Sequence, residues 1–184
     1  MPIFARTKLV IHDDCLTPAM GSPKKGLSYA TVSYSGPNPQ TLYEQIKKLI
    51  VVVFGAQERE IQERNFSWDR SKPEETFRVT FEFVKDLDSF SFMWFTIILT
   101  GVARPSRQFG KEGNADMRIE AALRTEYPQD TLWQRSLLYE MFRAFYHRFI
   151  YEDKRQKFKN DCRDLVGQLQ NEIKSFLNVL SKSG

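Results

Sequence analysis

The alternation of hydrophobic and polar residues along the chain predicts two strands, a helix, four further strands and a long C-terminal helix. Every second residue is apolar at Thr76–Val84 and at Ala115–Glu126, as in strands that bury one face. The other expected strands are Thr7–Ile11, Ser28–Tyr34, Arg59–Asp69, which slips near Arg64, and Ser89–Val102. We therefore expect an α+β fold, in which an antiparallel sheet of about six strands packs on the C-terminal helix.

The helix between the two groups of strands is expected at Pro39–Phe54. Proline is favoured in the first turn of a helix, and Gly55 provides a stop at the other end. Five apolar residues recur with the period of an α-helix: Leu42, Ile46, Leu49, Ile50 and Val53. This stripe predicts that one face of the helix packs on the core.

Two features of the expected sheet concern its surroundings. Ser89–Val102 is apolar on both faces, so either both faces are covered or one of them lines a ligand site. Pro105–Asn114 is polar and contains two glycines, which predicts a loop between the last two strands.

The C-terminal helix, Thr131–Ser181, divides into two apolar halves. The first half carries a wide apolar arc made of Leu138, Met141, Phe142, Phe145, Phe149 and Ile150. We expect the sheet to close over this half of the helix. Glu152–Lys157 is polar on every side of the helix and marks the boundary between the two halves. It divides the chain into an α+β domain at residues 1–151 and a helical extension at residues 152–184.

Beyond Lys157, apolar residues recur at spacings of 4, 3, 4, 4, 3 and 4, which resembles a coiled-coil heptad. They are Phe158, Cys162, Leu165, Leu169, Ile173, Phe176 and Leu180. Two interpretations stay open. The helix either bends near Asp153 and packs on its own domain, or forms an arm that pairs with another chain. In the second interpretation all of these residues except Cys162 form the oligomer face.

This order of elements resembles the helix-grip fold of the START and Bet v 1-like proteins, in which an antiparallel sheet wraps a long C-terminal helix. The resemblance covers about residues 28–151, and it is one of topology, without a shared short motif. It departs from the family in that the helix at Pro39 follows a strand pair and the C-terminal helix runs past the grip length. Glu63–Arg70 and Tyr127–Leu138 are also similar to stretches of uncharacterised archaeal proteins.

The helix-grip resemblance implies a ligand that is bound between sheet and helix. On that basis the candidates for an apolar pocket are the aromatic residues of the central strands and of the helix: Phe81, Phe83, Phe92, Trp94, Phe142, Phe145 and Phe149. The alternative is that the same side chains fill an ordinary core, because aromatic residues bury large areas.

Motifs that would indicate catalysis are missing from the sequence. It has no phosphate-binding glycine loop and no G-x-S-x-G nucleophile elbow. The two histidines and two cysteines show no metal-ligand spacing, so we expect no metal and no cofactor. The sequence therefore leans against an enzyme. No signal peptide or transmembrane stretch is found, and we expect two free thiols in the cytoplasm.

The net charge of +4 comes from the C-terminal segment. Residues 131–184 hold ten Lys and Arg against six Asp and Glu, whereas the rest of the chain holds seventeen of each. Four basic residues fall near one face of the helix: Arg148, Arg155, Lys159 and Arg163. This face is either solvated or contacts nucleic acid or an acidic protein.

Three functions follow from these patterns. The leading hypothesis is a non-catalytic helix-grip-like domain that binds an apolar small molecule or a protein partner. The alternative is an assembly protein that dimerises or docks through the heptad-like part of the helix. The second alternative is nucleic-acid binding through the basic face of the helix. The identity of the ligand or partner is not encoded in any motif.

Overall fold

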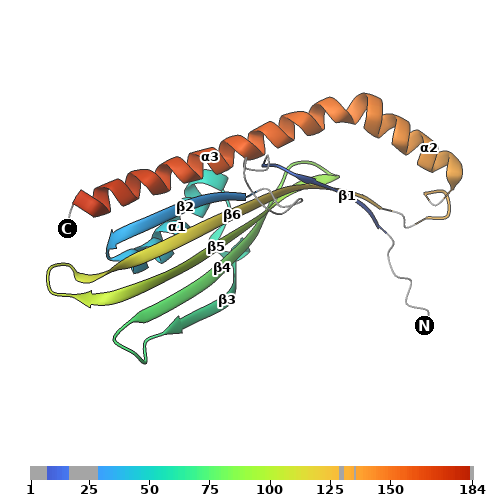
Figure 1. Ribbon diagram of the computed structural model, residues 1–184. Helices are drawn as coiled ribbons and strands as arrows, with labels where there is room; N and C mark the ends of the chain where they lie inside the picture. The colour runs from blue at the N-terminus through green and yellow to red at the C-terminus, as the bar shows by residue number, and fades with distance from the viewer. Residues whose placement is uncertain (1–7, 17–28, 129–130, 135, 183–184) are drawn as a thin grey trace, which may run out of the picture.

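The computed structural model describes residues 8–16, 29–128, 131–134 and 136–182, and it shows an antiparallel sheet with helices on one face (Figure 1). The strands are β1 (Lys8–Asp14), β2 (Tyr29–Pro37), β3 (Gln62–Asp69), β4 (Glu75–Asp86), β5 (Ser91–Ser106) and β6 (Gly110–Pro128). The helices are η1 (Pro39–Thr41), α1 (Leu42–Phe54), η2 (Glu58–Glu60), α2 (Leu137–Tyr146), the π-helical turn η3 (His147–Tyr151) and α3 (Glu152–Lys182). The predicted α+β class and the antiparallel sheet are confirmed.

Strand β6 pairs with three other strands, β1, β2 and β5. The strand order is β1-β6-β5-β4-β3, and β2 also pairs with β6. Strand β1 pairs with residues 122–128 of β6 and β2 with residues 112–120, so these two strands follow one another along the same edge. All neighbouring strands are antiparallel.

The six predicted strands are present with shifted ends. The expected slip in β3 is a register shift between Arg64 and Ser67, where Asn65 has a positive φ of 52°. The predicted loop at Pro105–Asn114 is wrong, because β5 and β6 continue as a hairpin through most of it. A Cβ atom at Gly113 would collide with the Val102 carbonyl oxygen. This glycine therefore permits a close approach of two strands and does not mark a loop.

One face of the sheet forms the core with α1 and α3. The fully buried side chains include Phe81, Phe95, Ile97, Leu99 and Ile119 from the strands, Ile46 and Ile50 from α1, and Leu169 and Ile173 from α3. The predicted stripe of α1 is buried as expected, and Gly55 ends this helix with a φ of 67°.

The opposite face of the sheet is only partly shielded. Phe92 and Trp94 of β5 lie there, half-buried, and the Arg124 guanidinium lies 4.2 Å from the centre of a Trp94 ring. The two apolar faces of β5 therefore have different surroundings. One lies in the core, and the other is shielded in part by arginine.

The C-terminal helix is arranged opposite to expectation. Its second part, α3, lies along the sheet and α1, and it buries Cys162, Val166, Leu169, Ile173 and Leu177. Its first part, α2, lies at one end of the molecule (Figure 1), and none of its residues is buried. The expectation that the sheet closes over the aromatic half of the helix is wrong.

Candidate functional site

Helix α2 begins later than the sequence indicates. Thr131 and Gln134 form a capping box, because Gln134 N donates to Thr131 Oγ1 (3.2 Å) and Thr131 N donates to Gln134 Oε1 (3.0 Å). These bonds close a turn ahead of the helix. Ser136 is the actual N-cap, and its hydroxyl accepts a hydrogen bond from Tyr139 N at 3.2 Å.

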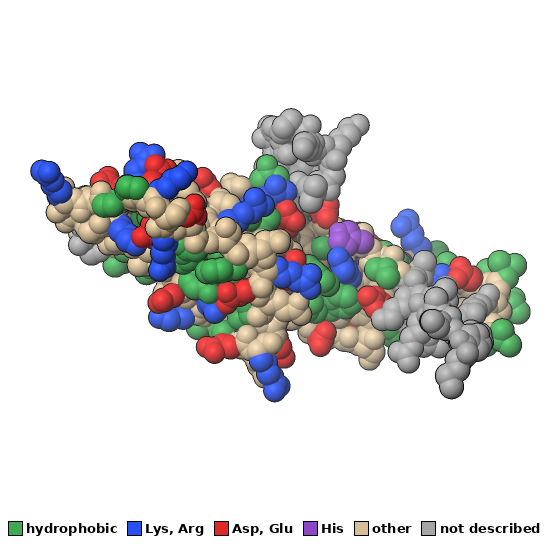
Figure 2. All heavy atoms as spheres, turned by 90° about the horizontal axis from the view of Figure 1, so that it is seen from below, with side chains coloured by type: hydrophobic (Ala, Val, Ile, Leu, Met, Phe, Trp, Pro, Cys, Tyr) green, Lys and Arg blue, Asp and Glu red, His purple; other side chains and the backbone are tan. Residues whose placement is uncertain are grey.

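Exposed hydrophobic residues are concentrated on α2 and the turns beside it. Ten of the sixteen large exposed hydrophobic residues in the described part of the chain fall between positions 132 and 150. They are Leu132, Trp133, Leu137, Leu138, Met141, Phe142, Phe145, Tyr146, Phe149 and Ile150, and we call them the α2 face. Figure 2 shows hydrophobic side chains gathered at the end of the molecule where α2 lies. Contiguous apolar patches on monomers rarely exceed a few hundred Å² and are often functional.

Two stripes with the same spacing divide α2 into an outward and an inward side. Leu138, Phe142, Phe145 and Phe149 follow one another at spacings of 4, 3 and 4, and all four are exposed. The rings of Phe145 and Phe149 lie 4.7 Å apart, which confirms that they share a face. Ser136, Glu140, Arg143 and His147 have the same spacing two residues earlier, and all four are half-buried. The polar stripe therefore faces the domain, and the apolar stripe faces away from it.

The inward stripe contacts the end of β6. His147 Nδ1 lies 3.0 Å from the Tyr127 hydroxyl, and the Arg143 guanidinium lies 5.8 Å from the centre of the Tyr127 ring. Arg143 also pairs with Glu140 at 3.0 Å. Helix α2 is thus attached to its own domain by polar groups.

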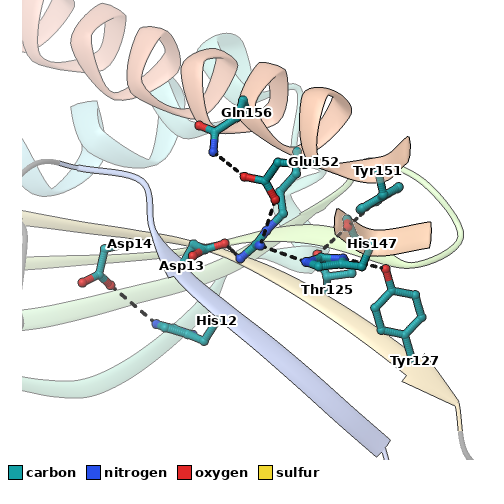
Figure 3. A network of polar contacts seen from close by, with 11 residues as sticks. His12, Asp13, Asp14, Thr125, Tyr127, His147, Tyr151, Glu152 and Gln156 are labelled. Atoms are coloured by element: carbon teal, nitrogen blue, oxygen red, sulfur yellow. Dashed lines mark hydrogen bonds and ion pairs between the residues drawn. The ribbon is translucent and has the colours of Figure 1, made fainter. Parts of the chain in front are cut away.

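The π-helical turn η3 joins α2 to α3, and such turns bend helices at defined places. Arg155, one turn into α3, is buried and pairs with Asp13 at the end of β1. Figure 3 shows Asp13 close to His147 and Glu152 at this point. Its Nη1 lies 3.0 Å from His147 Nε2 and 3.7 Å from Glu152. Because a guanidinium only donates, His147 Nε2 accepts this bond, which leaves Nδ1–H to donate to the Tyr127 hydroxyl.

Tyr151 anchors the same turn to the β4–β5 connection. Its hydroxyl lies 3.0 Å from Asp88 Oδ2 and 2.6 Å from Ser91 Oγ, which in turn lies 2.8 Å from Thr125 Oγ1. A carboxylate only accepts hydrogen bonds, so the Tyr151 hydroxyl donates to Asp88. It follows that Ser91 donates to Tyr151 and Thr125 donates to Ser91. Burial and the Asp88 charge raise the pKa of Tyr151 to about 12, so the phenol stays protonated.

Asp88 also binds Lys154 in the first turn of α3, with 2.8 Å between Oδ2 and Nζ. Burial raises the pKa of the Asp88 carboxyl, but the contact with Lys154 and the bonds from Phe90 N, Tyr151 and Ser91 N outweigh it. The net pKa lies below the usual value. We call His147, Tyr151 and Arg155 with their strand partners the helix joint. It holds α2 in its outward position.

No protein-family model matches this sequence, and no curated protein matches it either. The sheet packed against a long C-terminal helix is compatible with a helix-grip topology, and this likeness concerns architecture alone.

The structure does not bring the seven pocket candidates together. Phe81 and Phe83 are buried in the core, whereas Phe92 and Trp94 point to the opposite face of the sheet. Phe142, Phe145 and Phe149 are exposed on α2 and η3. A hollow of about 640 Å³ lies at the sheet edge beside Gly55, Arg64 and Lys85, and it is open to solvent. It includes Phe83 and Trp94, but no residue of the C-terminal helix.

The four basic candidates do not form one surface. Arg148 is exposed, while Arg155 is buried against Asp13. Arg163 donates from Nε to the Cys15 carbonyl oxygen at 2.7 Å. Lys159 is half-buried. Burial lowers the pKa of Arg155, although a guanidinium with neighbouring carboxylates remains charged.

The six residues of the expected oligomer face pack on the chain's own core. Leu169 and Ile173 are fully buried, and the others are partly buried against the same core: Phe158, Leu165, Phe176 and Leu180. In the residues that the structure describes, no helix combines the length and apolarity needed to cross a bilayer. Within the same residues, no group of three or more His, Cys, Asp or Glu side chains is placed to hold a metal.

The outward orientation of α2 is the feature that sequence reasoning missed. The sequence shows only that the polar stripe of α2 continues at helical spacing through Tyr151 to Arg155. The burial of Tyr151 and Arg155, which identifies this stripe as the inward side, is seen in the structure alone.

Proposed function

We propose that this chain is a non-catalytic docking domain, in which α2 presents an apolar surface to a partner protein. The observation that supports the proposal most strongly is the orientation of α2, whose polar stripe faces its own domain and whose phenylalanines face away. The apolar residues of a helix in this orientation are exposed to water, so they provide little hydrophobic stabilisation until another surface covers them.

The size of the α2 face supports a protein partner. Five of the ten residues are aromatic, with roughly 150–250 Å² of surface each, and the other five are somewhat smaller. Exposed by 40–89%, the ten together present on the order of 1,000 Å². At about 25 cal/mol per Å², covering such an area is strongly favourable. A small molecule would cover only a fraction of it.

The other functions receive less support from the geometry. A ligand between sheet and helix would compete with side chains that are already fully buried there, such as Phe95 and Leu169. In the described part of the C-terminal helix, the basic candidates form no continuous surface for nucleic acid, because Arg155 and Arg163 are engaged with their own domain. A helix-grip ancestry and a cytoplasmic location, which two buried free thiols suit, remain part of the proposal.

A pair of matched variants tests the proposal. The docking variant carries Phe142→Glu and Phe149→Glu. The control carries Val52→Glu and Val179→Glu, which are 77% and 63% exposed on α1 and α3. At concentrations low enough to keep each chain monomeric, we expect both variants to keep the unfolding free energy within about 1 kcal/mol, as exposed sites do. At the same low concentrations, only the docking variant should lose retention on a hydrophobic-interaction column.

The opposite result is equally clear. If the docking variant unfolds more easily than the wild-type monomer by about 3–5 kcal/mol, as expected when large residues leave a core, the α2 face belongs to the chain's own interior. The proposed docking function is then wrong. Equal retention of the docking variant and the monomeric wild type would also refute it.

A further inference from the structure

On the basis of the proposed docking function, we infer that the partner is a second copy of this chain, bound α2 to α2 in a two-fold symmetric dimer. The α2 face then covers itself, because a two-fold interface uses the same patch on both subunits. No second protein is needed to complete the surface.

The area of the α2 face matches this partner. A standard stable interface buries about 800 Å² on each side. The exposed apolar surface of the α2 face is on the order of 1,000 Å², by the same estimate as above. One copy of the face is therefore large enough to form a stable dimer without help from the rest of the molecule.

The spacing of the phenylalanines matches the partner as well. Leu138, Phe142, Phe145 and Phe149 repeat at 4, 3 and 4, which is the spacing of a seam between two paired helices. In an antiparallel pair, Leu138 lies opposite Phe149 of the partner subunit, and Phe142 lies opposite Phe145 of the partner subunit. Helix α3 leads away from the C-terminal end of α2 (Figure 1), so the antiparallel arrangement keeps the two bodies at opposite ends.

The charge around α2 favours a protein over a lipid surface. Helices that lie on membranes carry many Lys and Arg on their polar face. The polar stripe of α2 holds one acidic and one basic residue, Glu140 and Arg143, which pair with each other at 3.0 Å. Among the described residues of α2 and η3, Arg148 is the single Lys or Arg beyond that pair. These residues therefore offer few fixed positive charges to an anionic membrane.

Sedimentation velocity on the full chain tests the inference. At tens of micromolar we expect a dimer for the wild type and for the Val52→Glu/Val179→Glu control. The Phe142→Glu/Phe149→Glu variant should be a monomer, with a dissociation constant raised at least about a hundredfold, because truncating or charging a few central residues removes most of an interface's binding energy. A monomeric wild type, or a dimer that the Glu substitutions leave intact, overturns the inference.

Crosslinking tests the orientation. The single variants Leu138→Cys and Phe149→Cys are mixed in equal amounts and treated with a short bismaleimide. The native Cys15 and Cys162 are fully buried, and the hydrogen bond with Cys15 together with burial raises the pKa of Cys162, so both stay unreactive. The antiparallel pair predicts mixed 138–149 products. Crosslinks that join two copies of the same variant contradict it.

The remaining outcomes separate this inference from the docking proposal. A monomeric wild type that keeps its column retention, and whose stability the Glu substitutions do not change, refutes the second copy but leaves docking to a different protein. Binding of the wild type to vesicles of phosphatidylcholine and phosphatidylglycerol, lost in the docking variant, refutes both in favour of a lipid surface.

Discussion

Helices α2 and α3 are two parts of one helical segment, and they use their apolar residues in opposite ways. Helix α3 has a stripe through Cys162, Leu169 and Ile173 that is buried on the sheet and α1. The stripe of α2 through Phe142 and Phe145 is 69% and 58% exposed. Both parts are amphipathic, so amphipathicity shows that a face will be covered but not which surface covers it.

The difference depends on what each part finds at the sheet. Helix α3 meets the apolar side chains of β2 and β6 and the stripe of α1. Helix α2 runs into η3 and the first turn of α3, which meet strand ends and the β4–β5 connection. There Asp13, Asp88, Ser91 and Tyr127 offer polar groups to Arg155, Tyr151 and His147. A buried polar group requires a polar partner, so the helix turns its polar stripe inward at this end.

The largest expected effect comes from removing the same atoms on the two helices. Leu169→Ala on α3 should lower the unfolding free energy by about 2–5 kcal/mol, because Leu169 is fully buried. Leu138→Ala on α2, where leucine is 58% exposed, should change it by less than about 0.5 kcal/mol. Urea titrations measure both. The background should be Phe142→Glu/Phe149→Glu, so that dimerisation does not contribute. Equal losses at the two positions would erase the distinction between the helices.

A smaller effect is expected at the joint between them. Arg155→Met keeps the length of the side chain but leaves Asp13 and His147 without their partner. Breaking a fully buried pair costs about 3–5 kcal/mol. The Asp13 side chain is 27% exposed, so we expect about 2 kcal/mol. Lys157→Met, at an exposed position of the same helix, is the control and should be neutral. Hydrogen exchange should rise in α2 and η3 more than in α3. Uniform exchange would show that the joint does not orient α2.

Much of the fold was predictable because its signals are local. The alternation in β4 and β6, the stripe of α1 and Gly55 each act within a few residues of sequence. A bend near Asp153 was one of two interpretations, and the helix is interrupted slightly earlier, at the π-helical turn His147–Tyr151. The orientation of α2 depends on Asp13 and Tyr127, which are distant in sequence from its aromatic residues. For that reason the pocket and basic candidates each grouped residues that the structure separates, whereas the oligomer candidates stay on one face that packs on the chain's own core.

Removing one hydroxyl group at Tyr151 or at Tyr146 compares the anchored turn with the exposed helix. Tyr151→Phe removes the donor to Asp88 and the acceptor for Ser91, and it should lower the unfolding free energy by about 1 kcal/mol. Tyr146→Phe, whose side chain is 40% exposed on α2, should have almost no effect. Thermal unfolding of the two variants provides the measurement. A larger loss of unfolding free energy for Tyr146→Phe than for Tyr151→Phe would show that the Tyr151 hydroxyl does not anchor this turn.

The smallest expected effect is a pH dependence that tests where the anchored part of the helix begins. Asp88 holds Lys154 in the first turn of α3, and its pKa is lowered in the folded chain, so the unfolded state binds the proton more tightly. Its contribution is complete above the unfolded pKa of about 3.9 and is lost as the pH falls through the lower folded pKa. Asp88→Asn keeps an acceptor for Phe90 N and Ser91 N but carries no charge. Wild type should therefore exceed this variant by less than about 1 kcal/mol between pH 5 and 7. The difference should shrink from about pH 4 downward. Urea midpoints across this range measure it, and a difference that grows in acid would show that the Asp88 charge opposes the attachment of α3.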